Sequence, residues 1–330
     1  MSQRRVTAEL LDWYDVKGRV KYAEELEARG FAGATLAEIA DPDAFVVLAL
    51  AAGVTERLTL ETCVVQLGVR TAPSLAASSA TLQSLSDGRF RLGFGVSSEA
   101  IVAGWHSQPW RRPLAHARES LDLLRLLLDG EKSRYEGEVL SSSGFQLSQA
   151  VAHPVPLHLA ALNQGMMRLA GERADGVWLN YLPRSAAPTV CTIVDRAADE
   201  AGRDERPSKS LTAHIEVTDD VASARSALRD YLTFYMASPA YRKALSWHGF
   251  ANEIADIEAC FESRDRAGVM RAITDELIDS MTLVGSPTEV RDRIEEYFAA
   301  GIDEISVAPL TPGNLDRSLR AAVAAGGGGV

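Results

Sequence analysis

The feature that most limits the fold of this chain is a regular alternation of short apolar runs with amphipathic helical segments. We predict eight strands from these runs, at 4–11, 33–38, 58–65, 90–96, 156–161, 176–180, 210–217 and 304–308. Between the first two, the segment 16–29 carries apolar residues at helical spacing and stops at Gly30. Strand–helix units repeated about eight times favour a parallel (β/α)8 TIM barrel. A doubly wound α/β sheet is the competing fold.

Length and spacing predict one domain with two long insertions. The chain has 330 residues, which a single barrel with insertions fills comfortably, and we expect that domain to cover 1–325. We place the insertions at about 97–156 and 219–283. The first insertion is expected to hold a hairpin or excursion around 135–139 and 144–147.

The second insertion is rich in aromatic side chains at partly helical spacing. They are Tyr231, Phe234, Tyr235, Tyr241 and Trp247. Two interpretations stay open: a helical lid or dimer face that packs apolar side chains, and an aromatic wall over a substrate pocket. Beyond the barrel, the Gly-rich tail at 326–330 is predicted to be disordered.

The charge balance argues against nucleic-acid binding. Lys and Arg number 34 and Asp and Glu number 45, so the formal charge at pH 7 is −11, whereas phosphate backbones attract clustered Lys and Arg. No apolar run approaches the ~20 residues of a membrane-spanning helix, and no export signal follows the start. We therefore expect a cytoplasmic protein without a nucleic-acid or membrane partner. Cys63, Cys191 and Cys260 lie far apart without metal-binding spacing, so we expect no metal.

One glycine-containing strand, within 86–97, points to a ligand site. Gly93 and Gly95 alternate with larger apolar residues, so the end of this strand lacks bulk on one face. An α/β barrel places its chemistry at the carboxyl ends of its strands. We expect the exit of this strand to contribute Gly95, Val96, Ser97 and Ser98 to a cofactor site.

Five motifs, taken together and in order, resemble the luciferase-like monooxygenase superfamily. They lie at 57–60, 84–95, 104–106, 169–177 and 284–290. Within that superfamily the chain is most similar to the coenzyme F420-dependent oxidoreductases, of the methylenetetrahydromethanopterin reductase type. The resemblance covers most of the chain. It implies a TIM barrel that binds a flavin or deazaflavin at the carboxyl ends of its strands.

The resemblance also implies an uncommon backbone feature on the third strand. In this family a non-proline cis peptide bond forms a bulge behind the central ring of the cofactor. The residues expected to hold the bulge, and to contact the cofactor, are Cys63, Val64, Val65 and Gln66. Sequence alone gives no reason for such a bond, because a cis peptide outside X-Pro costs roughly 3–4 kcal/mol.

A phosphate site is expected after the strand at 156–161. The residues there are Asn163, Gln164, Gly165, Met166 and Met167, with Arg168 following. Free N–H groups at a helix N-terminus attract anions, and glycine permits close approach. A plain turn with a capping asparagine is the alternative. Candidates to complement the phosphate charge are Arg70, Arg89 and Arg168.

The chain departs from the sugar-phosphate dehydrogenases of the family. Where those enzymes have a histidine after the second strand and a glutamate after the fourth, this chain has Ile39 and Ser98. An apolar residue cannot take the proton of an alcohol. The resemblance therefore implies hydride delivery from the reduced cofactor to an activated C=C or C=N bond, which needs orientation and a proton donor. The candidate donors are Glu38, Glu99 and His106.

Two other functions stay open beside this F420-dependent reductase. One is a two-component monooxygenase that uses reduced FMN and oxygen. The other is a barrel without chemistry that serves as a binding partner. For the enzyme we expect a small-molecule or peptide substrate, and the resemblance implies a homodimer.

Overall fold

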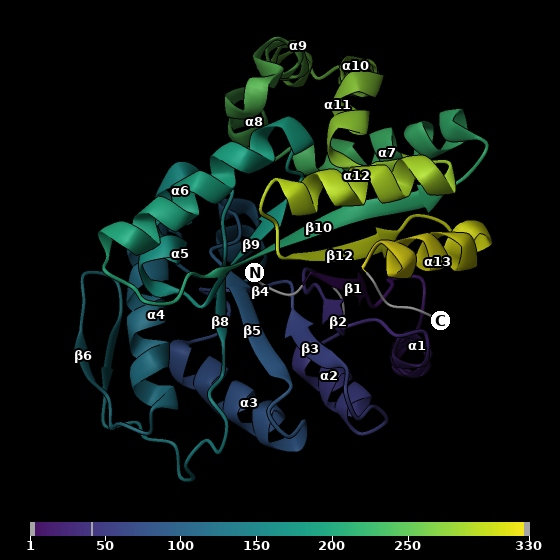
Figure 1. Cartoon of the computed structure of the whole chain (residues 1–330). Coiled ribbons are helices and arrows are strands. Elements are labelled where there is room, and N and C mark those ends of the chain that lie inside the picture. Colours follow the sequence, from purple (N-terminus) through teal and green to yellow (C-terminus); the bar gives the residue numbers. More distant parts are fainter. Residues whose placement is uncertain (1–3, 41, 327–330) are drawn as a thin grey trace. The chain divides into compact units, whose positions relative to one another are not determined.

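Eight parallel strands with surrounding helices build a (β/α)8 barrel in the computed structural model, which describes residues 4–40 and 42–326 (Figure 1). The barrel strands are β1 (Arg5–Glu9), β2 (Gly33–Leu36), β3 (Thr59–Thr62), β5 (Phe90–Gly95), β8 (Leu157–Ala160), β9 (Gly176–Asn180), β10 (Ser208–Val217) and β12 (Glu304–Pro309). All eight predicted strands are confirmed, and the doubly wound alternative is wrong. Of the predicted disordered tail, positions 327–330 lie outside the described residues.

The chain divides into two compact units, each described here by itself. The larger unit comprises 7–178 and 193–208. The smaller unit comprises the described residues of 1–6, 179–192 and 209–329. That the whole chain behaves as one domain stays a prediction.

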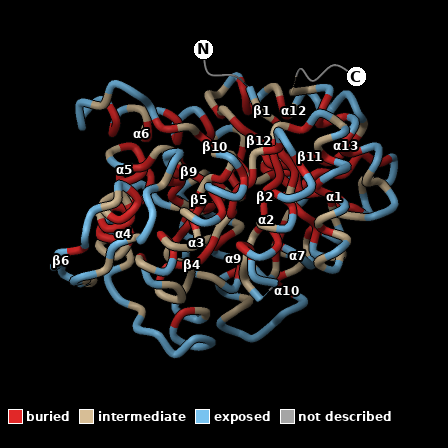
Figure 2. The backbone as a smooth tube through the Cα atoms, turned by 90° about the horizontal axis from the view of Figure 1, so that it is seen from below, coloured by how far each residue is buried: buried red, intermediate tan, exposed pale blue. Residues whose placement is uncertain are grey.

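In the larger unit, β1, β2, β3, β5, β8 and β9 pair in this order, and every pair is parallel. Its helices are α1 (Val16–Ala28), α2 (Ala44–Ala52), α3 (Ala72–Leu85), η1 (Ala100–Trp105), α4 (Pro113–Leu128), α5 (Gln164–Arg173) and the second half of α6 (Ala187–Glu200). The strands are mostly buried and the outer helix faces and loops exposed (Figure 2). Parallel strands covered by helices need apolar side chains on both faces, which explains their near-continuous apolar runs.

The ends of α1 follow from local sequence signals. Asp15 caps its start by accepting a hydrogen bond from the Gly18 N–H at 2.7 Å. After the last turn, Gly30 adopts a φ of +84°, a conformation that glycine adopts readily. The predicted helix 16–29 is confirmed to within one residue.

A buried ionic group joins three strands of the larger unit. The Glu61 carboxylate on β3 lies 2.7 Å from Nδ1 of His158 on β8 and 2.9 Å from Nη2 of Arg91 on β5. Glu61 is fully buried and His158 almost so. Breaking such a buried pair leaves an uncompensated charge, so the group favours one pairing of these strands.

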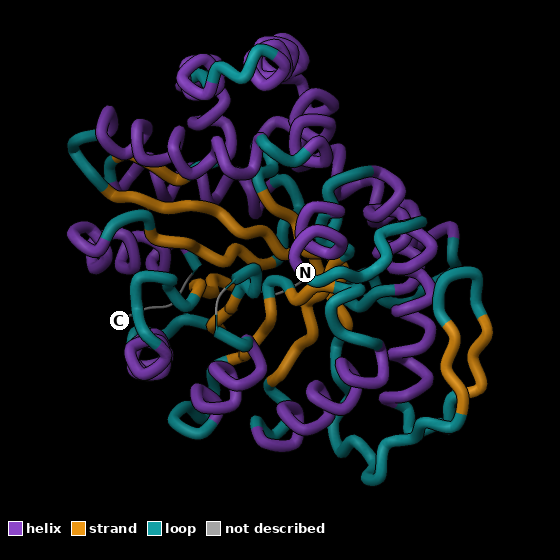
Figure 3. Tube along the Cα trace, turned by 180° about the vertical axis from the view of Figure 1, so that it is seen from behind, coloured by secondary structure: helices purple, strands orange, loops and turns teal. Residues whose placement is uncertain are grey.

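The first insertion forms the predicted hairpin with a shifted second strand. Strands β6 (Arg134–Glu136) and β7 (Ser141–Ser143) pair antiparallel, seen as a separate two-stranded ribbon in Figure 3. The second strand was predicted at 144–147. Glu119 explains the difference, because its carboxylate accepts the N–H groups of residues 138–140 and holds the turn there.

The smaller unit is built around β10, which pairs in parallel with β12 and with the short β11 (Leu283–Gly285). Its other elements are η2 (Arg184–Ala186), α7 (Val221–Met236), α8 (Pro239–Leu245), η3 (Ser246–Phe250), α9 (Ala251–Glu262), α10 (Arg266–Ala272), α11 (Asp275–Met281), α12 (Pro287–Ala299), η4 (Pro312–Asn314) and α13 (Leu315–Ala325). The second insertion is thus helical, as predicted. None of the helices in the described part of the chain is long and apolar enough to cross a bilayer.

The aromatic residues of the second insertion pack mainly on one another. The rings of Tyr235 and Tyr241 lie 4.7 and 5.7 Å from the buried ring of Tyr181. The Tyr181 hydroxyl lies 2.9 Å from Nε2 of His214, and burial lowers the pKa of that imidazole to about 4. These contacts favour the interpretation of the insertion as packed helices over that of an aromatic wall.

Candidate active site

The third barrel strand is interrupted by a non-proline cis peptide bond between Cys63 and Val64. The prediction of a cis bond within residues 63–66 is confirmed. After the interruption the chain resumes as β4 (Val65–Gln66), which pairs with β5. The interruption therefore lies beside the carboxyl end of β5, where the sequence predicts the cofactor.

The two glycines of β5 are explained by their neighbouring strands. A Cβ on Gly93 would lie 1.9 Å from the Thr62 carbonyl oxygen, and one on Gly95 would lie 2.9 Å from Cβ of Ala160. Both positions exclude a side chain, because the adjacent strands approach them too closely. Close packing of the strands therefore explains both glycines, without a ligand that approaches the backbone there. Contact of Gly95 with a cofactor stays a prediction.

The exit of β5 leads into an unusual helix. Ser97 has a positive φ of 59°, and the Ser98 carbonyl accepts the N–H groups of Ile101 and Val102 as η1 begins. η1 is a π-helix, a form that is rare and frequent at functional sites. Glu99 precedes it and His106 follows it, and both are exposed. The two candidate donors thus lie at opposite ends of one short helix.

Glu38, the third candidate donor, is engaged by its own loop. Its carboxylate lies 3.0 and 3.1 Å from Nη2 of Arg70 and accepts the Ala44 N–H at 2.7 Å, where α2 begins. Its backbone carbonyl accepts Nε2 of Gln66 at 2.6 Å. The carboxylate is already engaged in three hydrogen bonds within the protein, so these contacts favour a positioning role for Glu38.

Arg70 joins this loop to a second carboxylate. Its Nη2 lies 2.7 Å from Asp43, which also caps α2 by accepting the Val46 N–H. Burial acts to raise the pKa of Asp43, but the hydrogen bonds from Arg70 and Val46 outweigh it and hold that pKa below its ordinary value. From the sequence, Arg70 was expected only to complement the charge of a phosphate. Its two acidic partners lie about 30 residues away in sequence, so no local signal marks them.

The predicted phosphate loop is the N-terminus of α5. Asn163 caps this helix, because its Oδ1 accepts the Met166 N–H at 3.1 Å. Asn163 and Gln164 are exposed, whereas the side chains of Met166 and Met167 are buried. The Met167 N–H donates to the Asn163 carbonyl at 3.0 Å, so the backbone N–H groups of both methionines already have acceptors. Helix geometry leaves the first N–H groups without helical acceptors, which makes this end suited to an anion.

The predicted arginine partners of a phosphate have other contacts. Arg89 lies at the amino end of β5, where it binds the carbonyls of Leu58 and Ala52, so it is placed at the wrong end of the strand. Arg168 is exposed and pairs with Glu200 at 3.4 Å. The phosphate would therefore depend mainly on the backbone of the α5 N-terminus.

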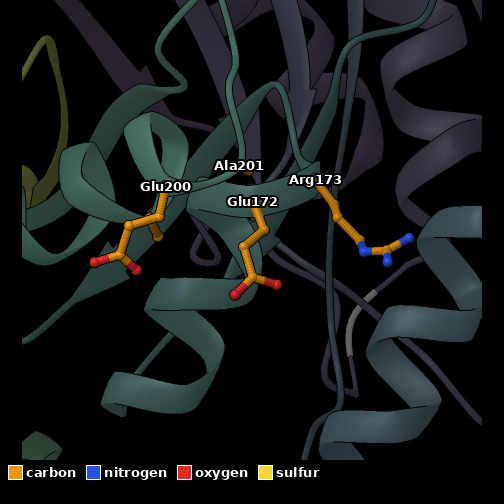
Figure 4. A pocket seen from close by; sticks show the side chains of 5 residues that line it. Glu172, Arg173, Glu200 and Ala201 are labelled. Atoms are coloured by element: carbon orange, nitrogen blue, oxygen red, sulfur yellow. The ribbon is translucent and has the colours of Figure 1, made fainter.

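A surface depression lies at the other end of α5. It has a volume of about 420 Å³ and is lined by Glu172, Arg173, Ala197, Glu200 and Ala201. The carboxylates of Glu172 and Glu200 project toward the same side, while Arg173 points away (Figure 4) and pairs with Asp122. Two carboxylates disfavour an anionic cofactor, and no predicted site residue lines this depression.

The chain is similar over most of its length to known proteins. The family model described as "Luciferase-like monooxygenase" matches residues 3–304. A protein of Mycobacterium tuberculosis, named provisionally as a coenzyme F420-dependent oxidoreductase, is 30% identical over 304 residues, covering 84% of this chain and 86% of that protein.

Solved structures share the fold at lower identity. The coenzyme F420-dependent tetrahydromethanopterin reductase of Methanopyrus kandleri has a TM-score of 0.80 at 21% identity and covers 98% of both chains. The FMN-bound oxygenating constituent of 3,6-diketocamphane monooxygenase from Pseudomonas putida has a TM-score of 0.73 at 19% identity, covering 97% of this chain and 96% of that one. The fold alone thus accommodates either kind of cofactor enzyme.

Proposed function

This chain belongs to the luciferase-like monooxygenase family, and from that membership we propose that it transfers a hydride from reduced coenzyme F420 to an activated C=C or C=N bond. The chain is an oxidoreductase of the F420- or flavin-dependent kind. The substrate is a small or peptide metabolite. The observation that carries the F420 proposal is the 30% identity, over most of both chains, to a relative named for F420.

We place the binding site for such a cofactor in the larger unit. The Cys63–Val64 bulge would lie behind the ring, and the α5 N-terminus would hold the phosphate. Asn163 already satisfies the Met166 N–H, so the earlier amides at Gln164 and Gly165 are the expected anion donors. A Cβ at Gly165 would lie 3.3 Å from Asn163 Oδ1 and 3.5 Å from Cδ2 of Leu114, so a side chain here would crowd these neighbours.

When bound, reduced F420 supplies the hydride, and this chain must orient the substrate and supply a proton. The hydride adds to one atom of the double bond and the proton to its neighbour, while the cofactor is oxidised. We assign the proton to Glu99 or His106, which flank η1. We assign Glu38 to holding Arg70 and the start of α2, because its carboxylate already accepts three hydrogen bonds there.

The second candidate is an FMN-dependent monooxygenase. One observation favours it: the α5 N-terminus offers one anion position, and the nearby Arg168 is engaged by Glu200. FMN ends at a single phosphate, whereas F420 carries further anionic groups that call for a longer basic or open groove.

The test is separate titration of the full chain with F420 and with FMN, followed by fluorescence or heat. Selective F420 binding supports the reductase, and selective FMN binding supports the monooxygenase. Binding of neither makes a non-catalytic barrel the better description. Gly165→Glu should weaken cofactor binding at least tenfold, because it places a carboxylate at the anion position. Thr192→Glu adds the same charge at an exposed position of α6 and should leave the affinity unchanged.

A further inference from the structure

Three phenols and one imidazole of the smaller unit are linked into a continuous chain. The Tyr231 hydroxyl lies 3.4 Å from the Tyr235 hydroxyl on the same helix, α7. Tyr235 is hydrogen-bonded in turn to the side chain of Tyr181. The Tyr181 hydroxyl then lies 2.9 Å from Nε2 of His214 on β10. A phenol can both donate and accept a hydrogen bond, so each hydroxyl can connect its two neighbours.

This chain leads from the surface of the smaller unit to its interior. Tyr231 is 41% exposed and Tyr235 is partly buried, whereas Tyr181 is only 3% and His214 only 7% exposed. A buried group normally meets solvent only when the fold opens locally. A row of linked hydroxyls offers another route, because each one can accept a proton on one side and release a proton on the other.

Tyr181 is held in an uncommon conformation where the helix and the sheet are linked. Its φ is +49°, a value at which a bulky residue is an outlier. Such strain persists only where surrounding contacts hold it, and it gathers at functional sites. The contacts of the Tyr181 hydroxyl with Tyr235 and His214 hold this side chain. Tyr181 also directly follows β9, at the carboxyl end of a barrel strand, where a barrel places its chemistry.

The groups that face the His214 imidazole are neutral. They are the phenol of Tyr181, the ring of Tyr231 at 4.7 Å and the backbone of Ala308 on β12. Burial lowers the pKa of the imidazole to about 4, although the contact with Ala308 acts in the opposite direction. Near pH 7 His214 is therefore a neutral imidazole that can accept a proton.

We propose that the chain Tyr231–Tyr235–Tyr181–His214 is a proton relay between solvent and the interior of the smaller unit. A hydronium ion gives a proton to the Tyr231 oxygen, and Tyr231 passes its own hydroxyl proton to Tyr235. Tyr235 then passes its proton to Tyr181, and Tyr181 passes its proton to Nε2 of His214. One O–H or N–H bond forms for each O–H bond that breaks, so only the imidazole gains a charge. The reverse sequence returns the proton to solvent.

The test is the rate at which His214 exchanges its proton with solvent in the full-length protein. NMR relaxation dispersion on the Cε1–H signals of carbon-13-labelled histidine measures this rate. The measurement is made about one pH unit above the imidazole pKa of about 4, where roughly a tenth of His214 is protonated. The signal that is missing in His214→Gln identifies the residue.

Two substitutions interrupt the relay and keep the aromatic rings. Tyr235→Phe removes the middle hydroxyl, and Tyr231→Phe removes the hydroxyl of the exposed residue. Each should lower the exchange rate by about tenfold or more, because protonation of His214 then depends on local opening of the fold. The pKa of His214 should change little in both, since the contact with Tyr181 remains. Thermal melting checks that the variants fold.

Tyr241→Phe is the matched control. The ring of Tyr241 lies 5.1 Å from that of Tyr235, but its hydroxyl is bonded by Asn180 at 3.4 Å and lies outside the chain. This variant should keep the exchange rate of the wild-type protein. An unchanged rate in Tyr235→Phe and Tyr231→Phe, or an equal fall in Tyr241→Phe, would overturn the proposal. Because the readout is the exchange of one imidazole proton, it is independent of cofactor titration.

Discussion

Thr62 and Gly93 join two barrel strands through a reciprocal contact between a side chain and the backbone. The Thr62 hydroxyl donates to the Gly93 carbonyl at 2.7 Å and accepts the Gly93 N–H at 2.9 Å. The hydroxyl thus takes the place of a backbone ladder partner at the point where β3 ends and the cis bond follows. Only glycine allows the Thr62 backbone to come this close.

Gly93→Ala should therefore destabilise the protein by at least about 3 kcal/mol, because the added Cβ cannot be placed without moving a strand. Gly104→Ala is the control, since no atom lies within 4 Å of a Cβ there. Its effect should stay below about 1 kcal/mol. Urea unfolding of both variants measures the difference, and equal stabilities would show that the strands adjust freely.

Arg70→Met should lower the free energy of unfolding by about 2 kcal/mol at neutral pH, because Glu38 and Asp43 lose their shared cation. Arg57→Met is the control: Arg57 is 72% exposed and lies 3.9 Å from its carboxylate partner, so its removal should cost less than about 0.5 kcal/mol.

The Arg70 prediction also has a pH dependence. Because the folded pKa of Asp43 lies below its ordinary value, its stabilisation is present at neutral pH and is lost as the pH falls below about 4. NMR titration of Asp43 should show its pKa rising in Arg70→Met. An unchanged pKa would contradict the assigned pairing.

Exchanging the candidate proton donors separates their roles. A residue that gives the proton in a protonation-limited reduction should slow turnover by about 10²–10⁴-fold when it is replaced. We expect that loss for either Glu99→Gln or His106→Gln. For Glu38→Gln we expect less than about tenfold, together with a lower melting temperature, since its contacts hold Arg70 and α2. A loss of 10²-fold or more in Glu38→Gln with unchanged melting would restore Glu38 as the donor.

The buried His214 should make stability depend on pH between about 4 and 6.5. Burial lowers its folded pKa from the ordinary 6.5 to about 4, so the unfolded chain binds the proton first as the pH falls. Stability is therefore complete above about 6.5 and declines toward 4, by about 3 kcal/mol for this residue. His214→Gln should flatten the slope in urea unfolding, whereas Tyr231→Phe, which keeps the imidazole, should retain it. The same slope in all three proteins would contradict this origin.

The local sequence pattern was sufficient to predict the strands of the barrel. Strand positions follow from apolar runs, because parallel strands buried on both faces must be apolar whatever surrounds them. The helix cap at Asn163 was predictable as well, because the start of a helix depends on a few consecutive residues. The place of the Cys63–Val64 bond came from the family resemblance and not from the local residues.

Contacts between distant segments were decided by the tertiary structure alone. Gly93 and Gly95 indicated a strand end that lacks bulk on one face. In the structure, a side chain at either position would collide with Thr62 or Ala160 on the adjoining strands. Glu38 was a candidate proton donor from the sequence, but the tertiary structure places Arg70, 32 residues later, beside its carboxylate.

The apolar composition of α2 is likewise visible in the sequence, but which of its side chains are buried and which are exposed is not. A helix apolar on all sides can be fully buried or can leave one face exposed, and only the packing of Phe45 inward and Leu50 outward distinguishes these cases. The sequence by itself determines which segments form strands and helices, because that depends on neighbouring residues. Which side chains meet, and which remain exposed, depends on how those segments pack in space.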